Sequence, residues 1–258
     1  MRFLLRPGWL AFIAVVVAFV VTCYTLLAPW QFGREAERDA QRQAIEASSG
    51  IAPVPLAELV PAGAGVEPDV QWRQVEVTGT YLPDAEALVR LRVVDGRPAF
   101  EVLTPFRDDS GSVITVNRGS VAAPDSRVVP VFAAPPTGPV TLTGRLRVDQ
   151  ADPEERPAFT AQGHRQVYAA DSRTLAASTG LDLVAGHLQL ATGQPGVLDP
   201  IPVTPSTGGA PFTNLSYALQ WLTFGAIALF AMVYFVRLEL LQRRPNDRSE
   251  LRRALSGD

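Results

Sequence analysis

The stretch WLAFIAVVVAFVVTCYTLLA, residues 9–28, contains no charged side chain and decides the fold. At 1.5 Å per residue, an α-helix of this length crosses a hydrocarbon core of about 30 Å. Arg2 and Arg6 precede the stretch, so a cleaved signal peptide is the competing interpretation. The apolar run is longer than a typical signal-peptide core, and Pro29 follows the small residue at which cleavage would occur. We therefore predict a retained transmembrane helix over residues 9–28.

A second apolar stretch, LSYALQWLTFGAIALFAMVYFV at residues 215–236, predicts a second transmembrane helix over residues 213–236. Tyr217 and Trp221 lie near one end and Tyr234 near the other, where amphipathic rings favour the membrane interface. Arginines are concentrated in the terminal tails, residues 1–8 and 237–258. The positive-inside rule then places both tails in the cytoplasm of a bacterial cell, and the region between the spans outside its plasma membrane.

The composition excludes several classes of protein. The chain has 258 residues, of which 47% are hydrophobic and only 19% charged, whereas a soluble domain carries about a quarter charged residues. A net charge of −3 excludes a broadly basic nucleic-acid-binding protein, since phosphate neutralisation needs a clustered cationic surface. The single cysteine, Cys23, excludes an intramolecular disulfide and a multi-cysteine metal site.

Residues 29–69 are predicted to connect the first span to a folded domain. The polar sequence GREAERDAQRQAIEA, residues 33–47, is typical of a solvated helix that extends the first span beyond the membrane. Residues 50–68 are rich in Ala, Pro and Gly and lack sustained periodicity, which predicts a linker with one turn at residues 56–60.

The region 70–212 changes to a period of two, which indicates β-strands. Strands are predicted within residues 70–81, 88–94, 100–106, 112–119, 139–148 and 186–191, separated by turn sequences that suit antiparallel connections. One short helix is predicted at residues 171–179, capped by Asp171 and ended by Gly180. The predicted fold class is a membrane protein in which two transmembrane α-helices flank a mainly antiparallel β (α+β) extracytoplasmic domain.

The chain offers little for catalysis. Nucleophilic catalysis of the Ser/His or Cys/His kind needs a histidine held near a nucleophile, and the chain has only His164 and His187. Neither belongs to a recognisable motif; we expect His164 to be exposed and His187 to be a hydrogen-bonded or solvated strand residue. The carboxylates are scattered along the chain. We therefore predict neither a metal site nor an enzyme.

Small and polar side chains recur along one face of each predicted span. The stripe of the first span is Ala11, Ala14, Ala18, Thr22 and Thr25, and that of the second is Thr213, Ser216, Gln220 and Thr223, continued by Ile227 and Ala231. Such stripes allow close helix approach, and the Gln220 amide needs a hydrogen-bonding partner in lipid. The structural interpretation is that the spans pack on each other through these stripes. The functional interpretation is that the stripe of the second span faces a membrane cofactor or a partner subunit.

Four segments of the chain together resemble one protein family. They are LAPWQFGR (residues 27–34), WRQVEVTGTYLP (72–83), the pair FEVLTPF and SVITVNRG (100–106 and 112–119), and NLSYALQW (214–221). In order, spacing and two-span topology, they resemble the Surfeit-locus family of cytochrome c oxidase assembly factors. The corresponding family segments are the exit from the first span, a strand with Trp, Val, Gly and Tyr, a Leu-Thr-Pro and Val-Asn-Arg-Gly strand pair, and the start of the second span.

Two positions depart from the family pattern. Ser120 follows the Asn-Arg-Gly motif where the family generally has tryptophan, which removes a bulky contact. Asn214 stands where the family usually has histidine at the start of the second span. Imidazole is an axial ligand of haem iron, and asparagine is a poor substitute for it. We therefore expect no tightly bound cofactor and at most a transient contact with haem a; the alternative role for Asn214 is a helix cap.

The resemblance implies a non-enzymatic factor that assists haem a insertion or stabilises the oxidase membrane subunit. Its implied partners are the cytochrome c oxidase membrane subunits or a respiratory supercomplex, in the lipid bilayer and without nucleic acid. The cofactor-binding candidates are Asn214, Tyr217, Gln220 and Trp221, and the partner-binding candidates are Trp30, Gln31, Arg34, Arg118 and Gln220. We expect Arg118 to pair with a carboxylate, a haem propionate or a partner protein. The alternative function is a membrane-anchored scaffold or binding module of another envelope complex.

Overall fold

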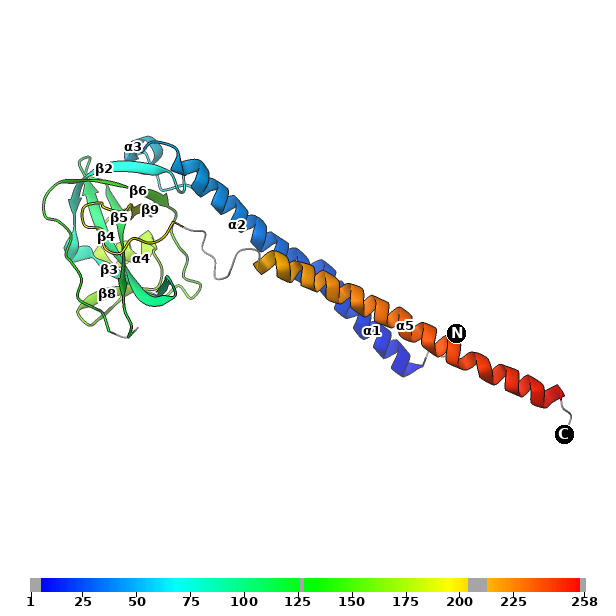
Figure 1. Ribbon diagram of the computed structural model, residues 1–258. Coiled ribbons are helices and arrows are strands. Elements are labelled where there is room, and N and C mark those ends of the chain that lie inside the picture. The colour runs from blue at the N-terminus through cyan, green and yellow to red at the C-terminus, as the bar shows by residue number, and fades with distance from the viewer. Residues whose placement is uncertain (1–5, 126–127, 204–212, 256–258) are drawn as a thin grey trace. The chain divides into compact units, whose positions relative to one another are not determined.

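The computed structural model describes residues 6–125, 128–203 and 213–255 (Figure 1). The chain forms two compact units: a helical unit, which contains the described residues before 42 and after 204, and a β domain within residues 42–204. Long helices near both termini and a β-rich domain between them in the sequence confirm the predicted fold class.

The first membrane helix is continuous with its polar extension. α1 (Pro7–Thr22) begins with a proline, whose missing N–H is tolerated in the first helical turn. One π-helical turn, η2 (Cys23–Leu27), joins α1 to α2 (Ala28–Ser49). Pro29 cannot donate a backbone hydrogen bond and its ring crowds the carbonyl four residues earlier, so the wider π turn relieves that crowding. The helix predicted at residues 33–47 is confirmed within α2.

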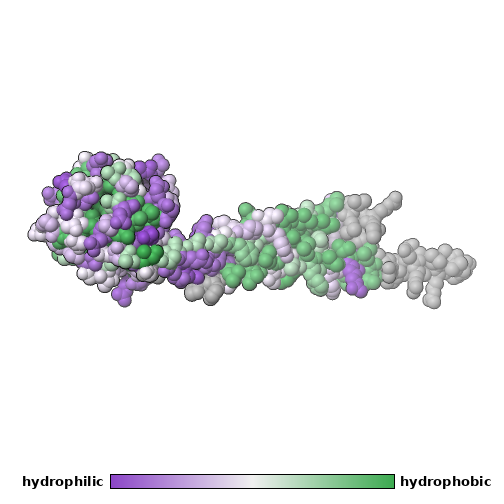
Figure 2. Space-filling view, turned by 90° about the horizontal axis from the view of Figure 1, so that it is seen from above, coloured by the Kyte–Doolittle hydropathy of each residue, from purple (hydrophilic) through white to green (hydrophobic). Residues whose placement is uncertain are grey.

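The second long helix is α5 (Thr213–Leu255). In the described part of the chain, two helical stretches, Pro7–Ser48 and Asn214–Gln242, are long and apolar enough to cross a membrane. Their large apolar side chains, such as Val15, Leu219 and Phe230, are exposed instead of buried in a core. Figure 2 shows the resulting hydrophobic surface along the helical unit, in contrast to the mixed surface of the β domain. Helices with this surface are stable in hydrocarbon, as two membrane spans require.

The β domain is built mainly of strands, with short helical segments between some of them. Its strands are β1 (Val54–Pro55), β2 (Gln74–Tyr81), β3 (Ala87–Val94), β4 (Arg97–Asp108), β5 (Val113–Ala122), β6 (Val140–Arg147), β7 (Phe159–Ala161), β8 (His164–Val167) and β9 (Leu183–Leu190). Its helical segments are α3 (Leu56–Leu59), the 3-10 turn η3 (Pro83–Ala85) and α4 (Ser172–Thr179).

Five strands close into a barrel in the order β2-β6-β9-β5-β4, and β4 returns to β2 through Gly79–Asp108 and the next two residue pairs. Every pairing in this ring is antiparallel except that of β5 with β9. β3, β8 and β7 continue the sheet beyond β4, and the short β1 runs parallel to β2. Closure leaves few strand edges to pair with another chain.

Apolar side chains that alternate along the strands fill the barrel. Val75 and Val77 of β2, Leu142 and Leu146 of β6 and Leu188 of β9 belong to the buried cluster. A second cluster lies where Leu175 of α4 packs against strand residues of β3 and β4. As predicted, Asp171 caps α4 by accepting hydrogen bonds from the backbone N–H groups of its first turn, and Gly180 ends it with φ 72°.

The linker predicted at residues 50–68 is only partly correct. α3 supplies the single turn expected near residues 56–60. Leu56, Val60 and Val66 are buried in the barrel core, however, and the Val66 N–H donates to the Ala185 carbonyl at 2.8 Å. Leu56 and Val60 are four residues apart, as in a helical turn, but Val66 follows them across the segment PAGAG, which carries no periodic pattern. Pattern analysis therefore could not place these residues in the core. The hairpin of β7 and β8 was also not predicted, because its strands are only three and four residues long.

Gly79 makes barrel closure possible, and replacing it with alanine tests this. A Cβ there would lie 2.1 Å from the Arg107 carbonyl oxygen and 2.7 Å from the Asp108 Cα, both backbone atoms. We expect Gly79→Ala to lower the free energy of unfolding by about 3 kcal/mol. For a domain of this size that lowers Tm by roughly 6–12 °C, measured by near-UV circular dichroism of the full chain in detergent. Gly50→Ala is the control, since no atom lies within 4 Å of its Cβ position; equal Tm values for both variants would contradict the prediction.

Candidate functional site

The two membrane helices contact each other through small residues and one tyrosine. The Tyr24 hydroxyl, in the π turn, donates to the Leu222 carbonyl of α5 at 3.1 Å. Gly225 gives the ring its space, because a Cβ at that position would lie 2.3 Å from the ring carbon Cε2. Cys23 and Ala218 are fully buried in the helical unit. Ala218 and Gly225 are seven residues apart, the spacing that keeps one helix face toward a partner helix.

The predicted stripes do not form this contact. Every described member of the first-span stripe is exposed, and so are Ser216, Gln220, Thr223 and Ile227 of the second. Ala231 is half-buried, and the side chain of Thr213 lies outside the described residues. The structural interpretation of the stripes was therefore wrong, because Gly225 and Ala218 allow a closer approach on another face of α5. We call Ser216, Gln220 and Thr223 the α5 stripe.

Gln220 differs from the threonine hydroxyl groups in these stripes. Thr22, Thr25 and Thr223 each donate to the carbonyl four residues earlier in their own helix, at 2.9, 2.7 and 2.8 Å. Across the residues that the structure describes, the Gln220 amide forms no hydrogen bond, and its side chain is exposed. The α5 stripe therefore contains one amide whose hydrogen-bonding capacity is open to an external partner.

Asn214 joins the start of α5 to α2. With the amide turned to suit its neighbours, its N–H donates to Gln31 Oε1 at 3.2 Å, and its oxygen accepts from Arg38 Nε and Nη1 at 3.2 and 2.7 Å. Arg38 also pairs with Glu35 at 3.7 Å. Two predicted site residues, Asn214 and Gln31, are thus brought together. Arg38, which sequence reasoning missed, lies seven residues after Gln31 and so on the same helix face.

The remaining predicted residues near the membrane are not gathered into one site. Tyr217 is exposed like Gln220, whereas Trp221 is half-buried and packs edge-on against Phe224 with ring centroids 5.8 Å apart. Trp30 is exposed, and the Arg34 guanidinium lies 5.9 Å from its ring centroid. This cation–π pair, four residues apart on α2, suits a position at the membrane surface.

The start of α5 does not fit a haem-iron ligand set. Asparagine is a poor iron ligand, and the Asn214 amide is already hydrogen-bonded to Gln31 and Arg38. Asn214 is also the second residue of α5, so it is not the helix cap that the sequence allowed. Among the described residues, no group of three or more His, Cys, Asp or Glu side chains is placed to hold a metal ion.

Arg118 is completely buried, and each of its guanidinium nitrogens has a partner within the β domain. Its Nη1 pairs with Glu86 Oε2 at 2.8 Å, and its Nε and Nη2 donate to the carbonyls of Gly196 and Ala133 at 2.8 and 2.7 Å. Arg118 was expected to pair with a carboxylate, a haem propionate or a partner protein, and in the structure it pairs with the Glu86 carboxylate. Its side chain is enclosed, so we assign it to the interior of the domain and not to its surface.

A buried polar row on the outer face of the barrel was missed by sequence reasoning. Glu101 of β4 accepts from Asn117 Nδ2 at 2.9 Å and pairs with Arg92 Nε at 3.0 Å. On β6, Arg147 donates to Gln189 Oε1 of β9 at 2.6 Å and stacks over the Trp72 ring at 3.8 Å. The Gln189 amide N–H in turn donates to the Ile201 carbonyl at 3.0 Å. Segments outside the barrel strands, at Trp72 and Ile201, contact this row.

His187 lies beside this row and is buried, in contrast to the expected hydrogen-bonded or solvated residue. Its Nδ1 atom has no hydrogen-bond partner within the described ranges. Burial lowers the pKa of His187 to about 3, and the positive charges of Arg147 and Arg92 act in the same direction. His164 is half-buried, with its ring 5.8 Å from that of Phe132. Neither arrangement places a histidine as a general base beside a nucleophile.

Most of the chain is similar to one family of proteins. The SURF1 family matches residues 18–226. A SURF1-like protein of Mycobacterium tuberculosis is 44% identical over 244 residues, which cover 95% of this chain and 89% of that protein. A SURF1-like protein of Monosiga brevicollis is 30% identical over 251 residues, covering 88% and 86%. The cytochrome oxidase assembly protein SHY1 of Saccharomyces cerevisiae is 31% identical over 110 residues, covering 39% of this chain and 27% of that protein.

Cysteine crosslinking distinguishes the observed helix contact from the predicted one. In a Cys23→Ala background, Phe12→Cys with Phe235→Cys should crosslink with a short bifunctional reagent, because the two rings meet at 6.5 Å between centroids. Ala18→Cys with Thr223→Cys should not crosslink within one chain, because both side chains face outward. Mobility on a denaturing gel measures the product; the opposite pattern would restore the stripes as the contact between the spans.

Proposed function

The chain belongs to the SURF1 family, and from this membership we propose that it assists the assembly of a haem-containing cytochrome c oxidase without itself catalysing a reaction. The similarity to SHY1, a protein named for cytochrome oxidase assembly, supports this role. The factor acts on the oxidase membrane subunit, either during maturation or as a component that remains attached to a respiratory supercomplex.

The exposed amide of Gln220 carries the proposal. It lies six residues after Asn214, which is about 9 Å along the axis of α5 and inside the apolar stretch. An amide without a partner is unfavourable in hydrocarbon, and an interhelical hydrogen bond from such a group contributes about 0.6–2 kcal/mol. The Thr223 hydroxyl on the same stripe already donates to the Leu219 carbonyl of its own helix. We infer that the α5 stripe receives a transmembrane helix of the oxidase membrane subunit.

The arginine-rich tails support an orientation in which both termini are cytoplasmic and the β domain lies outside the bacterial plasma membrane. In this orientation the exposed pair of Trp30 and Arg34 lies at the outer membrane surface, where α2 leaves the bilayer. We propose that this pair contacts the same partner at the edge of the membrane, while the α5 stripe contacts it within the membrane.

Gene deletion with complementation tests the assembly role. Deletion should lower the haem a signal in reduced-minus-oxidised spectra of membranes, together with oxidase activity. Complementation with Gln220→Leu should recover about threefold less oxidase in complex with this protein than wild type, whereas Gln220→Asn, which keeps the amide, should recover more than Gln220→Leu. Immunoblots should show equal amounts of both variants. An undiminished haem a signal with normal activity would contradict the oxidase role and favour a scaffold for another envelope complex.

The composition of the purified protein tests the cofactor proposal. Because the Asn214 amide is engaged by Gln31 and Arg38, we propose that contact with haem a is transient and expect the protein to purify without stoichiometric haem. Asn214→His should increase haem retention if a pocket exists at the start of α5, while Asn214→Ser should not. Pyridine haemochrome spectra give the haem content. One tightly bound haem per wild-type chain would contradict the proposal.

A further inference from the structure

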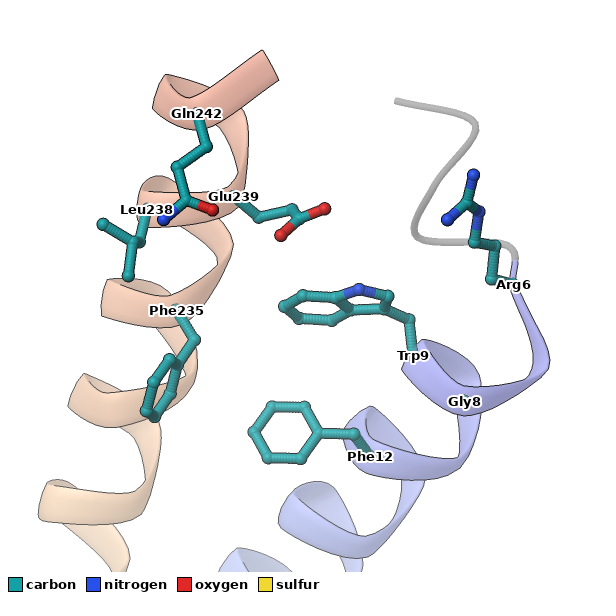
Figure 3. Close-up of a pocket in the computed structure, with 8 residues that line it drawn as sticks. All are labelled: Arg6, Gly8, Trp9, Phe12, Phe235, Leu238, Glu239 and Gln242. Carbon is teal, nitrogen blue, oxygen red and sulfur yellow. The ribbon is translucent and has the colours of Figure 1, made fainter.

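A groove of about 600 Å³ lies between α1 and α5, at the beginning of α1 and beyond the apolar centre of α5 (Figure 3). Arg6, Gly8, Trp9 and Phe12 line one wall, and Phe235, Leu238, Glu239 and Gln242 line the other. The volume falls in the range of about 300–1,000 Å³ that is usual for sites of small ligands. The groove is remote from Gln220 along α5 and is not used by the proposed oxidase contact.

The floor of the groove is aromatic. The Trp9 and Phe12 rings meet edge-on at 5.8 Å between centroids, and Phe12 meets Phe235 edge-on at 6.5 Å. In Figure 3 the rings of Trp9 and Phe12 point from α1 toward α5. Surfaces of this kind bind hydrocarbon chains, and Trp9 begins the first apolar stretch, where indole rings favour the membrane interface. The floor of the groove is therefore apolar, and Trp9 marks its end at the membrane interface.

Opposite charges occur at this end of the groove. The exposed Arg6 lies on the wall of α1 and the Glu239 carboxylate on the wall of α5, with the Gln242 amide beside it. Figure 3 shows the Glu239 side chain directed across the groove toward the side of Trp9 and Arg6. A ligand that fits this end carries an anionic group next to a cationic hydrogen-bond donor.

We propose that the groove binds one molecule of phosphatidylethanolamine. An acyl chain lies along Phe12 and Phe235, the phosphate contacts Arg6, and the primary ammonium contacts Glu239 and Gln242. Phosphatidylglycerol lacks the cation, and the quaternary ammonium of phosphatidylcholine has no N–H to donate, so both fit the rim less well. The proposal does not depend on the role in oxidase assembly.

Native mass spectrometry of the full chain in detergent, with equal amounts of added phosphatidylethanolamine, phosphatidylglycerol and phosphatidylcholine, tests the proposal. We expect one phosphatidylethanolamine adduct to dominate. Glu239→Gln should lower the ratio of bound phosphatidylethanolamine to phosphatidylglycerol by about threefold, the effect that a partly solvated ion pair supports. Gly8→Phe should reduce retention of all three lipids, because the new ring enters the groove from a position with no atom within 4 Å. Gly33→Phe, which is equally unobstructed but outside the groove, is the control.

Three results would overturn the proposal. The first is equal retention of all lipids by wild type and Gly8→Phe. The second is that wild type retains more phosphatidylglycerol than phosphatidylethanolamine, or that Glu239→Gln prefers phosphatidylethanolamine as strongly as wild type does. The third is a dimer of the chain that Gly8→Phe dissociates, which would make a second copy the occupant. Far-UV circular dichroism confirms helical content for each variant, so that lost lipid is not attributed to lost folding.

Discussion

The guanidinium of Arg118 holds together three parts of the β domain that are distant in sequence. A cation without exposed surface is stable only when its donors meet acceptors, and the three acceptors come from Glu86 before β3, Ala133 in the loop after β5 and Gly196 after β9. The next residue, Gly119, has φ 112°, and the Asp199 carbonyl packs against its Cα. A Cβ at this position would lie only 2.4 Å from the Asp199 carbonyl oxygen. Asn117 meanwhile accepts from the Gly119 N–H and donates to Glu101. The Val-Asn-Arg-Gly motif is thus one structural unit that fastens the segment leading toward α5 along β5.

The helical unit divides its surface between internal and external contacts. Pro29 is accommodated by a π turn that contains Tyr24, and Tyr24 lies against Gly225 and donates to Leu222. Because the internal contact uses the smallest residues, the α5 stripe remains on the outer surface. The packing between the two helices therefore determines which face of α5 is available to a partner subunit.

Local patterns predicted the parts of the fold that depend on local physics. The two spans follow from apolar length, the strands from a period of two, and α4 from Asp171 and Gly180. The contact face of the spans could not be predicted, because each span has small residues on more than one face and only the fit of Tyr24 to Gly225 decides between them. The candidate site was recovered in part: Asn214 contacts Gln31 as two predicted residues, but its second partner, Arg38, was not predicted. The partners of Arg118 and the cover over Gln189 come from distant loops, about which strand alternation carries no information.

The buried His187 makes the β domain less stable as the pH falls. In the unfolded chain the imidazole has an ordinary pKa of about 6.5, whereas burial near Arg147 and Arg92 lowers its pKa to about 3 in the folded domain. Between these values the unfolded chain binds a proton that the folded domain excludes, so each unit of acidification removes up to about 1.4 kcal/mol of stability. Above the unfolded pKa both states carry neutral imidazole and the residue has no influence on the balance. The burial of this one imidazole therefore makes the folding stability of the domain depend on the pH around it.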